Sequence, residues 1–334
     1  MVSVKRLLKA PAQQLAGTVA PFLWRWRAPS LVVMMYHRVL PHTHPDRATE
    51  QPGMYVSPET FEMHMHLLRK HFELVHLDDW LDALAENRPL PRHACAVTFD
   101  DGWRDNYQYA FPVLERLGVP ATVYLVSDLV GSSYSFWPNA LAKLVASGSQ
   151  ADTARLPAWL QAVIEETARA GLARGSAAHI DAIINRCKGS RSDEEMLDAL
   201  REAANPAPAE RDLMSWDEIR EAHRSGLVRF GSHTRRHQRL TKVRDAEQLR
   251  DEIVASREVI AEQLGTPPRT FCYPNGDVSP EALELVRRHY SGAVTTARSW
   301  NTAASDKHLL NRVGVHDDVS STPASFIARL AGVG

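Results

Sequence analysis

Short apolar runs alternate with amphipathic segments along most of the chain. Runs rich in β-branched and aromatic side chains predict buried strands at residues 31–36, 94–99, 121–126, 227–231, 270–273 and 292–296. Segments with apolar residues at helical spacing follow most of them, beginning near Pro58, Asp105, Trp216, Asp245 and Pro280. This repeated strand-then-helix order predicts an α/β fold with a parallel sheet and right-handed crossovers.

Local signals mark where several of the predicted helices begin and end. Ser57 precedes Pro58, which is the usual pairing of a helix N-cap with a proline at the first helical position. Ser215 and Glu218 have the spacing of a capping box. Gly118 follows the helical pattern of residues 105–117 and predicts its C-terminal end.

Residues 132–212 interrupt this alternation. The segment is rich in alanine and charged residues, and it contains helix-forming patches at 158–170 and 193–203. We expect a mostly helical insertion, which could be a lid, a partner surface or a passive excursion. The chain then divides into an N-terminal segment, 1–30, and a main domain, 31–334, that contains the insertion.

Charge and cysteine usage narrow the class of protein. The 334 residues include 39 Lys and Arg against 40 Asp and Glu, so no broad basic surface for nucleic acid is expected. The three cysteines lack metal-ligand spacing and do not form a disulfide framework; Cys95 and Cys272 fall in predicted strands and should be buried thiols. A neutral polymer or a small molecule is therefore the expected substrate class.

The N-terminal segment superficially resembles a signal peptide, with basic residues before the apolar stretch 15–24. However, Arg25 and Arg27 stand where a small-residue cleavage site should be, so we expect the segment to be retained. It is too short and too interrupted to cross a membrane. It could pack on the main domain, or residues 24–27 could rest on a membrane surface, which gives a cytoplasmic or membrane-peripheral location. The sequence predicts no oligomeric state.

Two clusters of polar residues follow predicted strands. Asp100 and Asp101 end the strand 94–99, and His233 and His237 follow the strand 227–231. Two histidines four residues apart can reach one centre if the segment is helical or tightly turned. One carboxylate and two imidazoles leave room for water, as in catalytic metal sites, and the spare carboxylate could act as a general base. The pattern therefore favours metal-assisted hydrolysis over a structural metal site, for which a fourth ligand is missing.

The chain resembles a family at four places in order. The stretches TFDDG at 98–102 and HTRRH at 233–237 match the first two motifs of polysaccharide deacetylases of the NodB-homology type, carbohydrate esterase family four. The stretch FCYPNG at 271–276 resembles the third motif, and MYHRV at 35–39 resembles a segment of the exopolysaccharide-type branch. The resemblance implies a distorted (β/α)7 barrel with a helical insertion, and makes residues 31–334 the catalytic domain.

The resemblance also implies roles for individual residues. Asp101, His233 and His237 would be the metal ligands, and Asp100 the general base. His37 is preferred over His316 as the general acid, because it follows a clear predicted strand and an unperturbed imidazole pKa of about 6.5 suits proton transfer near neutrality.

The third motif would line the substrate groove. Tyr273, Pro274 and Gly276 are expected to bind substrate, and Trp103 and Trp300 could stack on sugar rings. Cys272 stands where many members of the family have an arginine that holds the catalytic aspartate. Arg269 or Arg312 could supply that contact from elsewhere in the chain.

The leading functional hypothesis is a metal-dependent hydrolase that removes N-acetyl groups from an amino-sugar polymer or a lipid-linked glycan. Zn²⁺ is the default for two histidines and a carboxylate, although Co²⁺, Ni²⁺ or Fe²⁺ suit the same ligands. Two alternatives stay open at this point. One is a hydrolase of small N-acyl or cyclic amides, and the other is a carbohydrate-binding relative without turnover.

Overall fold

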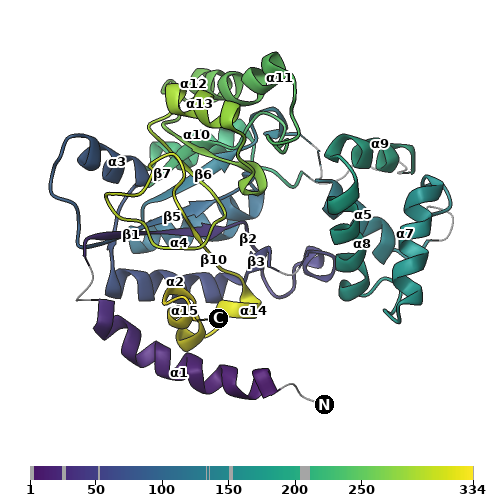
Figure 1. Ribbon diagram of the computed structural model, residues 1–334, viewed down its shortest axis with the longest axis horizontal. Coiled ribbons are helices and arrows are strands. Elements are labelled where there is room, and N and C mark those ends of the chain that lie inside the picture. Colours follow the sequence, from purple (N-terminus) through teal and green to yellow (C-terminus); the bar gives the residue numbers. More distant parts are fainter. Residues whose placement is uncertain are drawn as a thin grey trace. The chain divides into compact units, whose positions relative to one another are not determined.

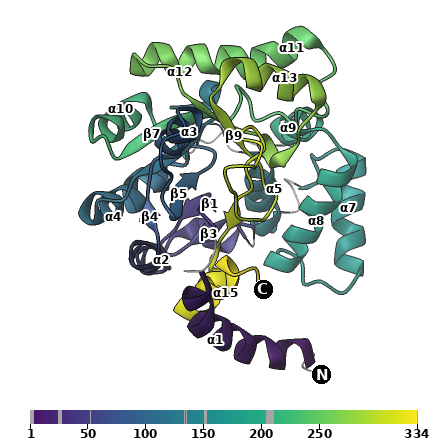
Figure 2. The same cartoon turned by 60° about the vertical axis from the view of Figure 1, so that its left-hand side comes forward.

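The computed structural model describes residues 4–24, 28–51, 53–132, 134, 136–149, 153–203 and 211–333. Its main sheet has the strand order β10-β1-β5-β6-β7-β8-β9, with β4 beside β5, and every pairing in it is parallel. The sheet curls on itself with helices outside it (Figures 1 and 2), which confirms the predicted distorted (β/α)7 barrel. The strands are β1 (Ser30–Tyr36), β4 (Glu73–Leu74), β5 (His93–Phe99), β6 (Ala121–Leu125), β7 (Val228–Ser232), β8 (Thr270–Cys272), β9 (Gly292–Val294) and β10 (Val313–Gly314).

The helices of the barrel cover the outer face of the sheet. They are α2 (Pro58–His71), α3 (Leu77–Ala85), α4 (Phe111–Leu117), α10 (Trp216–Arg224), α11 (Ala246–Arg250), α12 (Ser256–Leu264), α13 (Pro280–His289), α14 (Asp317–Ser320) and α15 (Pro323–Leu330). Ser57 caps α2 and Ser215 forms the capping box of α10 with Glu218, as predicted. Gly118 ends α4 in the left-handed conformation.

Four differences from the expected elements involve short or irregular structure. The helix predicted at 245–264 is α11 and α12 joined by a π-helical stretch, Asp251–Ala255. The helix predicted at 105–117 likewise begins with a π-helical stretch, Asn106–Ala110. β10 is absent from the prediction because two residues are too few to produce an apolar period. A separate parallel pair, β2 (Arg38–Val39) with β3 (Tyr55–Val56), follows β1.

The strands are buried on both faces, as expected for a parallel sheet enclosed by helices. In β1, the residues from Leu31 to Met34 have no exposed surface. All three cysteines are free thiols and buried, which agrees with the sequence interpretation.

A second compact unit consists of residues 40–54 and 133–212. Its helices are α5 (Trp137–Ala146), α7 (Ala158–Arg169), α8 (Ala177–Ser190) and α9 (Asp193–Ala203). They enclose a hydrophobic cluster of their own, formed by side chains such as Leu141, Leu160, Ile183 and Met196. The loop 40–54 joins this unit through polar contacts. Asn139 Nδ2 donates to Glu50 Oε2 at 2.8 Å, and Gln51 Nε2 donates to Asp181 Oδ1 at 3.1 Å.

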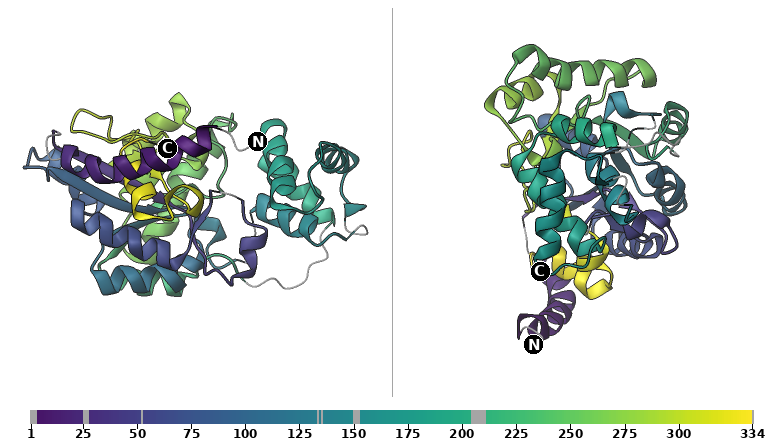
Figure 3. Two further views of the ribbon diagram at one scale, coloured as in Figure 1. Left: turned by 90° about the horizontal axis from the view of Figure 1, so that it is seen from below. Right: turned by 90° about the vertical axis from the view of Figure 1, so that its right-hand side faces the viewer.

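The N-terminal segment forms the helix α1 (Val4–Trp24), which lies against α15 near the C-terminus (Figure 3). Gly17 makes the close approach possible, because a Cβ there would lie 3.1 Å from the Ala324 Cα. Trp24 is buried against Phe72 and Trp300, with ring centroids 5.3 and 5.4 Å away. Of residues 24–27, for which membrane contact was one of two alternatives, Trp24 packs on the barrel and residues 25–27 lie outside the described residues. None of the described helices has the length and apolarity needed to cross a bilayer.

Candidate active site

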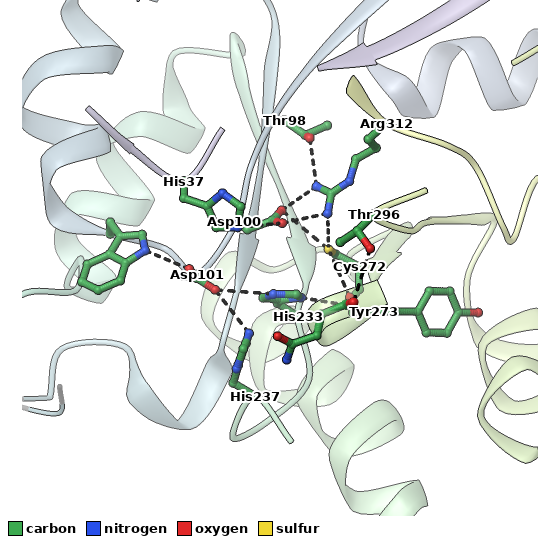
Figure 4. A network of polar contacts seen from close by, with 12 residues as sticks. His37, Thr98, Asp100, Asp101, His233, His237, Cys272, Tyr273, Thr296 and Arg312 are labelled. Atoms are coloured by element: carbon green, nitrogen blue, oxygen red, sulfur yellow. Dashed lines mark hydrogen bonds and ion pairs between the residues drawn. The ribbon is translucent and has the colours of Figure 1, made fainter. Parts of the chain in front are cut away.

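The predicted catalytic residues gather at the carboxyl edge of the sheet (Figure 4). Asp100 and Asp101 directly follow β5, His37 follows β1, and His233 follows β7. Backbone hydrogen bonds extend the strand pairing into these loops. The Asp100 N–H donates to the Tyr36 carbonyl at 3.0 Å, and the His233 N–H donates to the Leu125 carbonyl at 2.8 Å. The ends of the strands therefore determine the backbone positions of these residues.

Asp101, His233 and His237 point toward one centre. Asp101 Oδ1 lies 3.5 Å from His233 Nε2 and 3.5 Å from His237 Nε2. Tetrahedral coordination with bonds of about 2.0–2.1 Å separates ligand atoms by about 3.3 Å. The donor set and its spacing thus fit a divalent cation bound by three protein groups, with a fourth position left open.

Two hydrogen bonds orient the ligands. Trp103 Nε1 donates to Asp101 Oδ2 at 2.9 Å, which leaves Oδ1 facing the histidines. His233 Nδ1 lies 2.8 Å from the Cys272 carbonyl oxygen, which can only accept, so Nδ1 carries the proton and Nε2 is left as the ligand atom. The Arg38 guanidinium lies over the Trp103 ring at 4.2 Å and pairs with the buried Asp105 at 2.9 Å.

The loop that carries both histidines is a tight bend rather than a helix. Thr234 and His237 have φ angles of 65° and 62°, in the left-handed region, and Asp101 across the site has a φ of 72°. Such conformations cost about 1–3 kcal/mol each and persist only where surrounding contacts hold them. Thr234 Oγ1 supplies one such contact, accepting a hydrogen bond from the His237 N–H at 2.9 Å.

A buried carboxylate holds the middle of the same loop. Glu252, in the π-helical stretch after α11, has no exposed surface. Its Oε2 accepts hydrogen bonds from the backbone N–H groups of Arg235 at 3.1 Å and Arg236 at 2.9 Å. Burial raises the pKa of Glu252 despite these contacts. No sequence pattern predicts the role of Glu252, because that role depends on how a helix packs against the loop 16–17 residues before it.

Arg312 replaces the arginine missing from the third motif. Its Nη1 lies 2.7 Å from Asp100 Oδ1 and its Nη2 lies 2.7 Å from Asp100 Oδ2, a bidentate pair with no exposed surface on the arginine. Burial alone would raise the pKa of Asp100, but the Arg312 guanidinium lowers it below its ordinary value. Arg269, the other candidate, pairs with Asp82, its Nη1 lying 2.6 Å from Asp82 Oδ2.

His37 is the better placed of the two candidate acids. Its Nε2 lies 3.7 Å from Asp100 Oδ2, so it belongs to the same group of side chains as the two carboxylates. The side chains of His37 and His316 are 22% and 21% exposed, so exposure does not separate them. The Nδ1 of His316 instead contacts Asp318 Oδ2 at 3.2 Å. Burial lowers the pKa of His316, so its imidazole is largely neutral at pH 7.

The charges around Asp101 favour a cation. Burial alone would raise the pKa of Asp101, but the hydrogen bond from His233 and the charges of His237 and His37 hold it well below its ordinary range. Burial alone would lower the pKa of His233, whereas contacts with Cys272, Asp101 and Asp100 raise this pKa well above its ordinary value. Two ionised carboxylates side by side thus attract positive charge to the space beside Asp101. A proton or a metal ion can supply that charge.

A second ligand group overlaps the first. Asp100, His233 and Cys272 also bring donor atoms within 4.8 Å of one another. However, Arg312 already occupies both oxygens of Asp100, and its Nη2 lies 3.2 Å from Cys272 Sγ. Burial raises the pKa of the Cys272 thiol, which keeps it protonated and a poor ligand. The Asp101 group therefore fits a metal better.

The residues predicted to bind sugar occupy unexpected positions. Trp103 is 1% exposed and supports Asp101, so it has no free face for a sugar ring. Trp300 packs on Trp24 beside the start of β1, at the opposite end of the barrel. Tyr273 is fully buried against Phe271.

The turn after Tyr273 lies beside the site. Pro274 is buried, and Gly276 has a φ of 73°. A Cβ at Gly276 would lie 2.2 Å from Thr296 Oγ1, so glycine is required for the turn to fit there. This leaves the backbone of the turn, rather than its aromatic ring, as the surface that could meet a substrate.

Comparisons with known proteins identify the family and the fold. A family model described as polysaccharide deacetylase matches residues 87–174 and 181–291. YxkH of Bacillus subtilis (strain 168), whose name gives polysaccharide deacetylase as an unproven activity, is 24% identical over 119 residues. The match covers 35% of this chain and only 39% of that protein.

Solved structures share the fold. The Streptococcus pyogenes deacetylase PplD, solved in complex with acetate, has a TM-score of 0.60 at 17% identity, covering 91% of this chain and 99% of that one. IcaB from Ammonifex degensii has a TM-score of 0.58 at 20% identity, covering 90% of this chain and 98% of that one.

The Asp100–Arg312 pair makes a testable contribution to stability. Arg312→Met should lower the free energy of unfolding by about 3–5 kcal/mol, because it leaves a buried carboxylate without its partner. Adding Asp100→Asn to that variant should recover most of the loss. Since the folded state lowers the pKa of Asp100, the stability that the ionised carboxylate adds to the wild type should be complete above the ordinary aspartate pKa of about 3.9 and be lost as the pH falls through the lower folded value.

Urea unfolding of the wild type and the three variants at pH 7 measures this coupling. Additive losses for Arg312→Met and Asp100→Asn would contradict it.

Proposed function

We propose that this chain, which belongs to the polysaccharide deacetylase family, is a metal-dependent hydrolase that removes N-acetyl groups from an amino-sugar glycan. The main observation behind the proposal is that two adjacent carboxylates face different partners. Asp101 faces two histidines, and Asp100 faces an arginine and a third histidine. A binding protein needs no such separation, whereas hydrolysis needs both a cation site and a proton acceptor.

Asp101, His233 and His237 would hold the metal, with Zn²⁺ as the default and Co²⁺, Ni²⁺ or Fe²⁺ compatible with the same atoms. A bound cation of this kind supplies Lewis acidity to a water and to the acetyl carbonyl. The protein contributes ligand orientation through Trp103 and the Cys272 carbonyl, which hold Asp101 and His233 with their ligand atoms inward.

Asp100 would accept the proton of the attacking water. Its depressed pKa keeps it ionised throughout the neutral range, so it is available as an acceptor without a prior deprotonation. Arg312 fixes the plane of the carboxylate through two hydrogen bonds. This rigid support takes the place of the motif arginine at the position of Cys272.

His37 would donate the proton that the departing amine requires. An amine leaves poorly as an anion, so its nitrogen must be protonated as the carbon–nitrogen bond breaks. His37 lies beside Asp100, its Nε2 3.7 Å from Asp100 Oδ2, and is partly exposed (Figure 4). That position would place it beside a substrate held between the metal and the open edge of the site.

The substrate is proposed to be an N-acetylated exopolysaccharide or lipid-linked glycan. Support comes from the stretch at 35–39, which resembles the exopolysaccharide-type branch, and from the partly open Pro274–Gly276 turn beside the site. Backbone groups of that turn could hydrogen-bond a sugar.

Removing any one ligand should abolish metal binding. Asp101→Ala, His233→Ala and His237→Ala should each lose stoichiometric metal and nearly all deacetylation while keeping the wild-type far-UV circular dichroism spectrum. The measurement is elemental analysis after dialysis against added Zn²⁺, with His316→Ala as the matched control that keeps the metal. Full metal occupancy in His233→Ala would overturn the ligand assignment.

Base and acid variants should differ in their dependence on the leaving group. Asp100→Asn and His37→Ala should both retain metal and lose about 10²–10⁴ in kcat on an N-acetyl amino sugar. On an activated acetate ester, whose alcohol leaves without protonation, His37→Ala should be spared and Asp100→Asn should not.

Acetate release from chito-oligomers and hydrolysis of 4-nitrophenyl acetate provide the two readings. Equal losses for His37→Ala on both substrates, or a selective loss in His316→Ala, would move the acid role to another residue.

A further inference from the structure

One face of α1 carries most of the large apolar side chains that the described part of the chain exposes. Leu15, Val19, Phe22 and Leu23 are 67%, 41%, 53% and 56% exposed, and Val333 is the other such residue. Their spacing places them on one side of the helix. Gly17, Ala20 and Trp24, which pack on the barrel, lie on the other. Because scattered apolar residues would not line up in this way, the stripe indicates a contact surface.

The charge of the same segment is strongly asymmetric. Residues 1–28 contain five basic residues, at positions 5, 6, 9, 25 and 27, and no acidic residue; the first acid in the chain is Asp46. The whole chain has a net charge of −1, so residues 29–334 carry −1 − 5 = −6. A negatively charged surface would therefore attract the N-terminal segment and repel the remainder of the protein.

We propose that α1 lies in the interface of an anionic lipid bilayer, with Leu15, Val19, Phe22 and Leu23 inserted among the acyl chains. An apolar stripe flanked by lysine and arginine is what such an interface selects, since burial of the stripe and attraction to anionic headgroups act together. A second copy of this chain is a poorer occupant, because an α1–α1 contact would bring together two helices that each carry three basic residues and no acidic one.

Further basic side chains lie near the C-terminal end of α1. Trp24 packs on Trp300, which lines a cavity of about 470 Å³ together with Arg298, Arg329, Ser299 and Thr302. Arginine and hydroxyl side chains are the groups that bind phosphate oxygens. A lipid headgroup beside the end of α1 would therefore meet favourable partners. The proposal concerns where the protein acts and does not depend on the function of the catalytic residues.

The test is flotation of the full chain with lipid vesicles. The wild type should float with vesicles of phosphatidylcholine and phosphatidylglycerol in a 7:3 ratio, much less with phosphatidylcholine alone, and less as the salt concentration rises. Leu15→Gln combined with Phe22→Gln should weaken binding at least about tenfold, because two large side chains lose their apolar burial. Val333→Gln, which changes an exposed apolar residue outside α1, is the matched control and should bind as the wild type does.

Two readouts decide the outcome. Because both altered side chains are exposed, thermal unfolding of the double variant should match the wild type, so weaker binding would not reflect misfolding. Wild-type protein that stays unbound on anionic vesicles would overturn the proposal, and so would a double variant that floats like the wild type. Concentration-dependent dimerisation that the double variant abolishes, without vesicle binding, would assign the stripe to a second copy.

Discussion

Two carboxylates at the end of one buried strand impose the main physical constraint on this molecule. Asp100 and Asp101 are 2% and 6% exposed, so neither can rely on water to stabilise its charge. Each needs its own positive partner, and the two partners must not compete. Arg312 meets both oxygens of Asp100, and the histidine pair faces Asp101. This division separates the carboxylate that we propose as the proton acceptor from the one that we propose as a metal ligand.

The same arginine ties together strands that are distant in the sheet. Its Nε donates to the Thr295 carbonyl just after β9 at 2.8 Å, its Nη1 lies 3.2 Å from Thr98 Oγ1 in β5, and its Nη2 lies 3.2 Å from Cys272 Sγ in β8. A guanidinium has five N–H donors in a rigid fork, so one side chain can serve all these acceptors at once. The residue that orients Asp100 is therefore held in place by the ends of three other strands.

Sequence reasoning works here where a signal is local and fails where it is not. Six strands of the main sheet, the caps at Ser57 and Ser215, and the order of the motif residues follow from nearby residue patterns. The two-residue strands β2, β3, β4 and β10 do not. Sequence patterns left Arg269 and Arg312 as two candidates for the contact with Asp100. Arg312 could not be singled out, because it precedes a strand of only two residues and reaches Asp100 only once the barrel has closed. The burial of Trp103 and the role of Glu252 were missed for the same reason, since each depends on packing between distant segments.

We propose that the metal is held by Asp101, His233 and His237 rather than by the overlapping group of Asp100, His233 and Cys272. X-ray absorption at the zinc edge of the Zn²⁺-loaded protein tests it most directly, because Zn–S bonds of about 2.3 Å are distinct from Zn–N and Zn–O bonds of about 2.0–2.1 Å. The account predicts a first shell of nitrogen and oxygen alone, with a multiple-scattering signal from two imidazoles. A sulfur atom in that shell, or the scattering of a single imidazole, would contradict it.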